Sequence, residues 1–251
     1  MQSHRVRWHR IALRTLPLRA MRQDRLMFRT GRRSALTMPH PDVFRFELRS
    51  NDFGWWADSE DKKRRSEIIT ANNTTVGAGD GDTIWTAFCV VLGDHPGLLN
   101  SQGGVAFPFG FITQWHSVDT TVGRGPVLAV NVSNNALKIQ TRSDTGGPSV
   151  VNQHYSGAVP AKGDKTYIVM QATFGEVGHL NAWINGSQLV NADTPIGYYN
   201  DPHAILGYPH WGLYAINQPT TDIVYIANPE WGTTDLSARI SSPLPVPDLT
   251  W

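Results

Sequence analysis

The chain has 251 residues, 40% of them hydrophobic and 17% charged, a balance that excludes an intrinsically disordered polymer and predicts one soluble globular domain. No apolar run is long enough to span a membrane as a helix. The net charge is +1, but residues 1–33 carry ten arginines and a single acid, Asp24, so the remainder has a net charge of −8.

The arginine-rich beginning of the chain differs from everything that follows it. Residues 1–38 are predicted to be a basic leader, either poorly ordered or the product of a start codon placed too early, and residues 39–251 are predicted to form one domain. The leader lacks the apolar run of about 7–15 residues that a signal peptide needs. Attraction to a polyanion is the alternative role for such a segment.

Beyond residue 40 the dominant pattern has a period of two, which is typical of strands with one buried face. Leu137 and Ile139, for example, alternate with Lys138 and Gln140. Runs of this kind predict strands, in chain order, at 43–49, 65–70, 83–91, 107–116, 127–132, 136–142, 168–174, 179–185, 211–217 and 222–227.

Turn signals separate these runs. Asn134-Asn135 and Asn185-Gly186 each lie between two apolar segments and predict two-residue hairpin turns. About ten short strands at this spacing predict an all-β fold, an antiparallel β-sandwich or barrel. The one cysteine, Cys89, lies inside an apolar run and is predicted to be a buried thiol.

Two strand segments each place reactive side chains two residues apart. Arg65 and Glu67 share one face of their strand, and Gln114 and His116 share a face of another, with Ile112 behind them. Taken singly, the Arg–Glu pair indicates a cross-strand ion pair and the histidine a structural residue.

A third segment shows the same spacing. In 208–214, an extended chain puts Tyr208, His210 and Tyr214 on one side, although Pro209 cannot donate a hydrogen bond to a neighbouring strand. A sheet can bring three such segments to one concave face, and this joint occurrence favours a catalytic site over three unrelated structural features.

The residues of these segments, RSEI at 65–68, QWH at 114–116 and YPHWGLY at 208–214, resemble the signature blocks of jelly-roll polysaccharide lyases. Alginate lyases of this kind carry R-[ST]-E-L, Q-[IV]-H and Y-F-K-A-G-x-Y in the same order. Heparin-lyase-I-like and glucuronan-lyase-like proteins have a similar last block. The resemblance covers residues from about 43 to 230, and it departs from the family at His210, where the family has lysine.

The resemblance implies a concanavalin-like jelly roll that cuts a uronic-acid-containing polysaccharide by β-elimination. His116 would be the base and Tyr214 the acid, or Tyr214 would do both in a syn elimination. Arg65 and Gln114 would neutralise the carboxylate of the substrate. The substrate-binding residues would be Tyr208, His210, Glu67 and Lys63, the last within the basic run 62–65.

The same resemblance sets expectations for partners. No cofactor and no catalytic metal are required, although the family admits a structural Ca²⁺ ion. The partner is an acidic polysaccharide such as glucuronan, alginate or a heparin-like polymer, with no nucleic acid and no membrane, and the protein is expected to be a secreted or periplasmic monomer. The alternative is a non-catalytic carbohydrate-binding jelly roll, which would not need Gln114, His116 and Tyr214 together.

Overall fold

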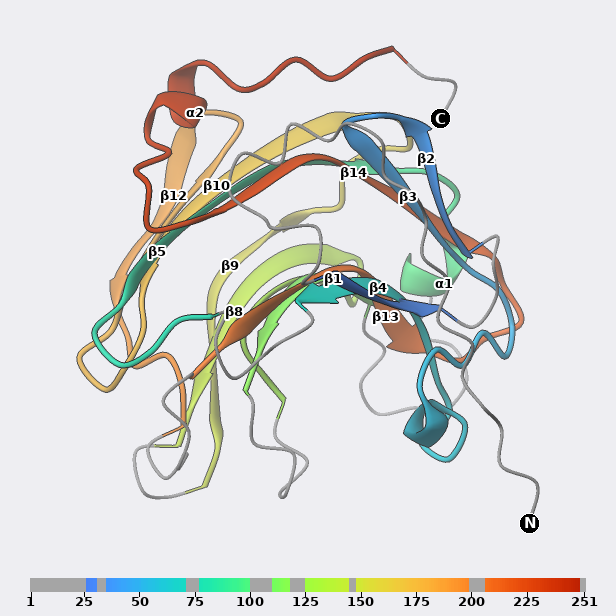
Figure 1. Cartoon of the computed structure of the whole chain (residues 1–251), viewed down its shortest axis with the longest axis horizontal. Coiled ribbons are helices and arrows are strands. Elements are labelled where there is room, and N and C mark those ends of the chain that lie inside the picture. The colour runs from blue at the N-terminus through green and yellow to red at the C-terminus, as the bar shows by residue number, and fades with distance from the viewer. Residues whose placement is uncertain are drawn as a thin grey trace.

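The computed structural model shows two antiparallel sheets stacked as layers (Figure 1). It describes residues 26–30, 35–70, 77–99, 110–117, 125–144, 148–198 and 206–248. This β-sandwich confirms the predicted fold class.

One layer, called the front sheet, has seven strands that together carry all the predicted site residues. Figure 1 shows it curving away from the other layer, so that its outer face is concave. Across the sheet the strands are β1 (Leu26–Thr30), β4 (Lys63–Thr70), β13 (Tyr208–Ile216), β6 (Gly110–His116), β7 (Pro126–Ser133), β8 (Ala136–Ser143) and β9 (Val150–Ala158).

The other layer, called the back sheet, also has seven strands. Across it they are β12 (Ser187–Asp193), β11 (His179–Ile184), β10 (Lys165–Thr173), β5 (Thr83–Leu92), β14 (Asp222–Gly232), β3 (Val43–Leu48) and β2 (Leu36–His40). The helical segments are short: η3 (Trp56–Asp58), α1 (Pro96–Leu99) and α2 (Ala238–Ser241). Among the described residues no helix is long and apolar enough to cross a membrane.

The main core lies between the sheets, because each strand turns alternate residues inward. Leu137 and Ile139 of β8 are 2% and 0% exposed, whereas Lys138 and Gln140 between them are partly exposed. Both predicted hairpins are present. Asn134 and Asn135 join β7 to β8, and all four hairpin residues, Asn185 and Gly186 included, have the positive φ angles of tight turns.

Several strands were not predicted, and they lie at or near sheet edges. β9 and β12 bury few side chains, so their sequences show no clear alternation. β1 pairs with β4, and β2 (36–40) crosses the boundary predicted at residue 38. The rest of the predicted leader, residues 1–25 and 31–34, lies outside the described residues.

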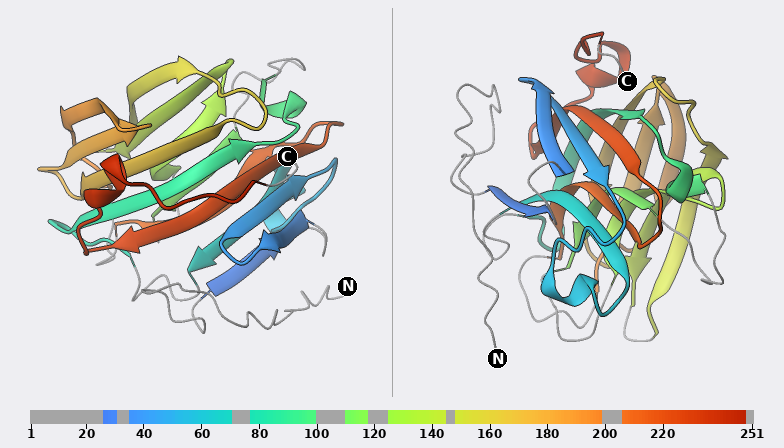
Figure 2. Two further views of the ribbon diagram at one scale, coloured as in Figure 1. Left: turned by 90° about the horizontal axis from the view of Figure 1, so that it is seen from above. Right: turned by 90° about the vertical axis from the view of Figure 1, so that its right-hand side faces the viewer.

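The segment after β14 crosses the outer face of the back sheet (Figure 2). Val246 packs against a cluster that includes Cys89, which is 1% exposed, as predicted for a buried thiol. Arg239 of α2 binds Glu230 at 2.7 Å, and Lys165 donates to the carbonyl oxygen of Val246 at 3.0 Å. The segment therefore covers part of the outer face of the back sheet.

Candidate active site

Three neighbouring strands of the front sheet, β4, β13 and β6, carry the predicted site residues. The alternate residues of β13 (Trp211, Leu213 and Ala215) belong to the core, so the site residues face outward, as strand parity predicts. The register pairs each site residue of β13 with one on a flanking strand: Tyr208 with His116, His210 with Gln114, and Tyr214 with Arg65.

Strict alternation predicts that Ile112 shares the site face with Gln114, but the structure shows that it does not. It is fully buried in the core, whereas Phe111 stacks on the ring of Tyr214 with centroids 6.2 Å apart. The register of β6 with β7 shifts between Phe111 and Thr113, which inserts one residue and changes the side of the sheet that each neighbour faces.

Gly212 is needed at the centre of the last segment. Its φ of +125° is unfavourable for other residues, and a Cβ there would collide with the carbonyl oxygen of Ser66 on β4. The register of β13 with β6 also shifts here, between Trp211 and Tyr214. The glycine thus lets β13 lie close to β4 while Tyr214 stays on the outer face.

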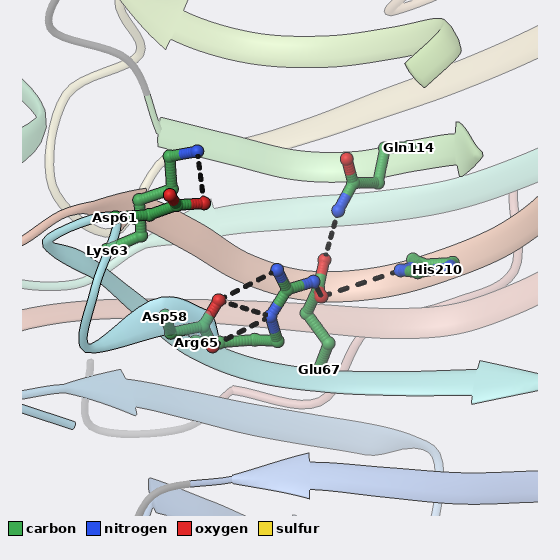
Figure 3. Close-up of polar contacts among 7 residues, drawn as sticks. All are labelled: Asp58, Asp61, Lys63, Arg65, Glu67, Gln114 and His210. Carbon is green, nitrogen blue, oxygen red and sulfur yellow. Dashed lines mark hydrogen bonds and ion pairs between the residues drawn. The ribbon is translucent and has the colours of Figure 1, made fainter. Parts of the chain in front are cut away.

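Arg65 is held by two carboxylates (Figure 3). Its guanidinium donates to Asp58 from Nε at 3.1 Å and from Nη2 at 3.0 Å, and from Nη1 to Glu67 at 2.8 Å. Its Cζ also lies 3.9 Å from the ring centroid of Tyr214. Burial would lower the pKa of Arg65, but the two carboxylates raise it above its ordinary value. The guanidinium is a permanent, fixed cation, only 8% exposed.

Asp58 was missed by the sequence analysis. It comes from η3, outside the strands, and is 2% exposed. No alternation pattern marks a residue of a short 3-10 turn, so only its acidity, seven residues before an arginine, could have suggested the pair.

Glu67 links three strands through its carboxylate (Figure 3). It accepts hydrogen bonds from Gln114 Nε2 at 2.6 Å and Arg65 Nη1 at 2.8 Å, and its Oε2 lies 3.4 Å from His210 Nδ1. Burial would raise its pKa, but Arg65, His210 and Gln114 hold the pKa well below its usual range. Glu67, Gln114 and His210 are each 1% exposed, and Glu67 contacts both of the others. Their predicted substrate contacts stay predictions.

His116 lies in a group of three rings at the end of β6. The centroid of its ring lies 5.7 Å from that of His210, with an angle of 24° between the ring planes, and 6.4 Å from that of Tyr208. Its Nδ1 is 2.9 Å from the carbonyl oxygen of Ser117. A carbonyl oxygen only accepts, so Nδ1 carries the hydrogen. Burial and the facing His210 lower the pKa of His116 to about 4. At neutral pH the ring is therefore uncharged, with its lone pair on Nε2.

Tyr214 lies at the opposite end of the candidate site from His116 and is partly exposed. Burial raises the pKa of Tyr214, although Arg65 and Lys63, which hydrogen-bonds to it, act in the opposite direction. Lys63 also binds Asp61 at 3.1 Å. Along β6, the partners of Tyr214 and Tyr208 are Phe111 and His116, so His116 and Tyr214 are about 16 Å apart in backbone position at 3.3 Å per residue. Gln114 and Glu67 lie between them.

The described residues include no group of three or more His, Cys, Asp or Glu side chains able to hold a metal ion. The expectations about cofactors and about Ca²⁺ stay predictions.

The geometry is that of a polar, charged cluster on a concave β-sheet. Comparison with known proteins shows the family of the chain. A family model described as polysaccharide lyase matches residues 7–229. The chain belongs to the polysaccharide lyase family. This lyase has no match among curated proteins.

Solved structures show the same fold at low sequence identity. The endo-β-1,4-glucuronan lyase of the fungus Trichoderma reesei has a TM-score of 0.57 and 14% identity, over 83% of this chain and 87% of that one. Alginate lyase A1-II′, a member of polysaccharide lyase family 7, has a TM-score of 0.56 and 16% identity, over 82% and 86%. The same enzyme with a histidine changed to asparagine and a tyrosine to phenylalanine, in complex with substrate, has a TM-score of 0.57 and 15% identity, over 82% and 84%.

Proposed function

We propose that this lyase cleaves a uronic-acid-containing polysaccharide by β-elimination on the outer face of the front sheet, leaving a 4,5-unsaturated uronate at the new end. A base removes the proton from C5 of the uronate, the C4–O bond breaks, and an acid protonates the departing oxygen. The electron pair of the C5–H bond becomes the C4–C5 double bond.

His116 is the base in this proposal, and its setting carries the argument. Its hydrogen on Nδ1 is held by the carbonyl oxygen of Ser117, so the neutral ring has its lone pair on Nε2. A pKa of about 4 makes the free histidine a weak base. A bound uronate carboxylate raises that pKa, because a nearby negative charge favours the protonated ring. The base is then strongest when substrate is present.

Tyr214 is the acid. Its position is fixed by Arg65, whose Cζ lies 3.9 Å from the ring centroid, and by stacking on Phe111. Arg65 and Lys63 both favour the phenolate, which eases transfer of the phenolic proton to the leaving oxygen. If the side chains of His116 and Tyr214 point toward each other, one sugar residue between them would span their separation.

Gln114 contacts the sugar between them. Its Nε2 is fixed by Glu67, and its buried Oε1 has no hydrogen-bond partner among the described residues. An unsatisfied buried acceptor costs about 1–3 kcal/mol, which a sugar hydroxyl would offset by donating to it. The second N–H of Nε2 donates to the uronate carboxylate. Arg65 acts from behind by fixing Glu67 and Tyr214.

The candidate substrates are glucuronan, alginate and heparin-like polymers. The named activities of the structural neighbours support the first two. The alginate lyase that was solved with substrate carries changes at a histidine and a tyrosine, which is consistent with a His/Tyr pair doing the chemistry in this fold.

The test mixes each polymer with purified protein and follows absorbance at about 235 nm, where an unsaturated uronate conjugated to its carboxylate absorbs. A rise is expected on at least one polyuronate. His116→Ala and Tyr214→Phe should each lower the rate by a factor of about 100 or more, the scale of a lost general acid or base.

Matched controls make the same changes on the back sheet. His179→Ala and Tyr167→Phe should keep the wild-type rate, because β11 and β10 lie in the other layer. Unfolding midpoints should agree within a few degrees for all four variants. Absence of a rise on every polymer, or full activity in both site variants, would overturn the proposal.

A further inference from the structure

β8 carries two cations on the same face as the candidate active site. Leu137, Ile139 and Thr141 are buried on the inner side, so Lys138, Gln140 and Arg142 lie on the outer side. All three are partly exposed. Two strand spacings separate β8 from β6, about 10 Å.

These cations differ in their partners from those of β4. The two cations of the β4 edge face three carboxylates: Arg65 binds Asp58 and Glu67, and Lys63 binds Asp61. These five side chains together have a net charge of −1. Lys138 and Arg142, in contrast, form no ion pair within the part of the chain that the structure describes. Among the cations whose side chains the structure describes on this face, those without an acidic partner therefore lie at β8, although the body of the protein is acidic.

Arg142 reaches the residue that precedes β7, the strand between β8 and β6. A Cβ built at Gly125 would collide with a guanidinium nitrogen of Arg142, so the guanidinium rests directly on that glycine. Gly125 immediately precedes Pro126, which pairs with His116. A larger residue at position 125 would displace the guanidinium.

Polar side chains continue the surface between the two cations. The register places Gln114, Ala129, Gln140 and Gln153 in one row across β6, β7, β8 and β9. Asn131 of β7 donates to Gln140 Oε1 at 2.8 Å. The three glutamine amides of this row, with a cation on either side of Gln140, suit a chain that has both hydroxyls and carboxylates.

We propose that Lys138 and Arg142 form a subsite that binds the carboxylates of uronate residues beyond the scissile bond, so that an acidic polysaccharide lies across β6, β7 and β8. This inference rests on the proposed function for its ligand. Charge complementarity selects the direction, because the β4 edge would repel a polyanion and the β8 cations attract it.

The experiment compares Lys138→Gln/Arg142→Gln with the control Lys162→Gln/Lys165→Gln. The control also removes two positive charges, from the start of β10 in the back sheet and from the turn before it. Initial rates are measured on whichever polyuronate the wild type cleaves, as a long polymer and as a trisaccharide. The β8 double variant should raise KM for the polymer about ten-fold or more, as expected for lost charge-assisted hydrogen bonds, and change kcat less. The effect should be smaller on the trisaccharide and should fade in high salt.

Binding is measured separately from cleavage. Affinity electrophoresis in gels containing alginate or glucuronan uses the His116→Ala/Tyr214→Phe variant, with and without the β8 changes. Retardation that is lost with the β8 changes supports the subsite even if no polymer is cleaved. Binding and cleavage can therefore fail independently, so failure of the subsite is distinguishable from failure of the proposed function. An unchanged KM, or retardation equal in both proteins or absent from both, overturns it.

Discussion

Arg64 and Arg65 are neighbours in sequence and have opposite surroundings. Arg64 points into the sandwich and is fully buried, with Nη2 2.6 Å from Asp222 and its other donors on the carbonyl oxygens of Leu48, Ile216 and Thr220. Arg65 points outward, between two carboxylates and the ring of Tyr214.

The difference shows that neighbouring basic residues on one strand can have two separate roles, one in the interior and one on the surface. Because neighbouring residues face opposite sides, the run 62–65 divides between the interior and the site face. Arg64 joins β4 to the ends of three other strands, whereas Arg65 fixes groups on one surface. Changes at the first should affect stability, and changes at the second should affect activity.

The largest expected effect is on stability, from Arg64→Met. It leaves Asp222 buried without its cation, which costs about 3–5 kcal/mol of unfolding free energy. Urea unfolding followed by tryptophan fluorescence measures this. Adding Asp222→Asn should restore part of the loss, since the lone buried charge is gone. The rate per folded molecule should stay within about two-fold of wild type; a large drop in kcat with little loss of stability would reverse the distinction.

A smaller effect on stability and a larger one on activity are expected for Arg65→Lys. The lysine keeps one positive charge but cannot bind both carboxylates with a planar fork or lie flat on Tyr214. We expect the rate to fall about 100-fold, equivalent to about 2.7 kcal/mol, and stability to fall by about 1 kcal/mol. Steady-state rates and urea unfolding of the same preparation measure both. Wild-type activity in this variant would show that Tyr214 needs no support from Arg65.

The smallest expected effect is a pH dependence of stability from His116. Its pKa is about 4 when folded and about 6.5 when unfolded, so the unfolded chain binds the extra proton first. Stability should fall as pH drops from 6.5 to 4, by on the order of 1–2 kcal/mol after allowance for partial exposure. His116→Asn should remove that slope. Glu67 acts in the same direction below its ordinary pKa, so the difference between variant and wild type is the measurement. Parallel curves would contradict the assignment.

The sequence predicted those parts of the fold that follow from regular alternation. The two Asn-containing hairpins and the outward face of 208–214 are present, because turn chemistry and strand parity are local properties. The resemblance of three short blocks led to the family that the match over residues 7–229 shows. Residue roles within the site remain predictions.

What the sequence did not reveal depends on departures from regularity and on distant contacts. Ile112 faces inward because one inserted residue changes the alternation of β6, and no residue type announces that shift. Asp58 reaches Arg65 from a short 3-10 turn. Arg64 binds Asp222 from 158 residues away, so nothing local distinguishes it from Lys63 and Arg65, which face outward on either side of it.

The segment that crosses the back sheet has a practical consequence for anyone who trims this protein by homology. The family match ends at residue 229, yet Leu236, Ile240 and Val246 pack on outer-face residues such as Trp85 and Cys89. A chain shortened to the matched region would keep every residue of the candidate site and uncover two apolar clusters, and exposed apolar surface promotes self-association. The packed structure therefore extends beyond residue 229, where the family match ends.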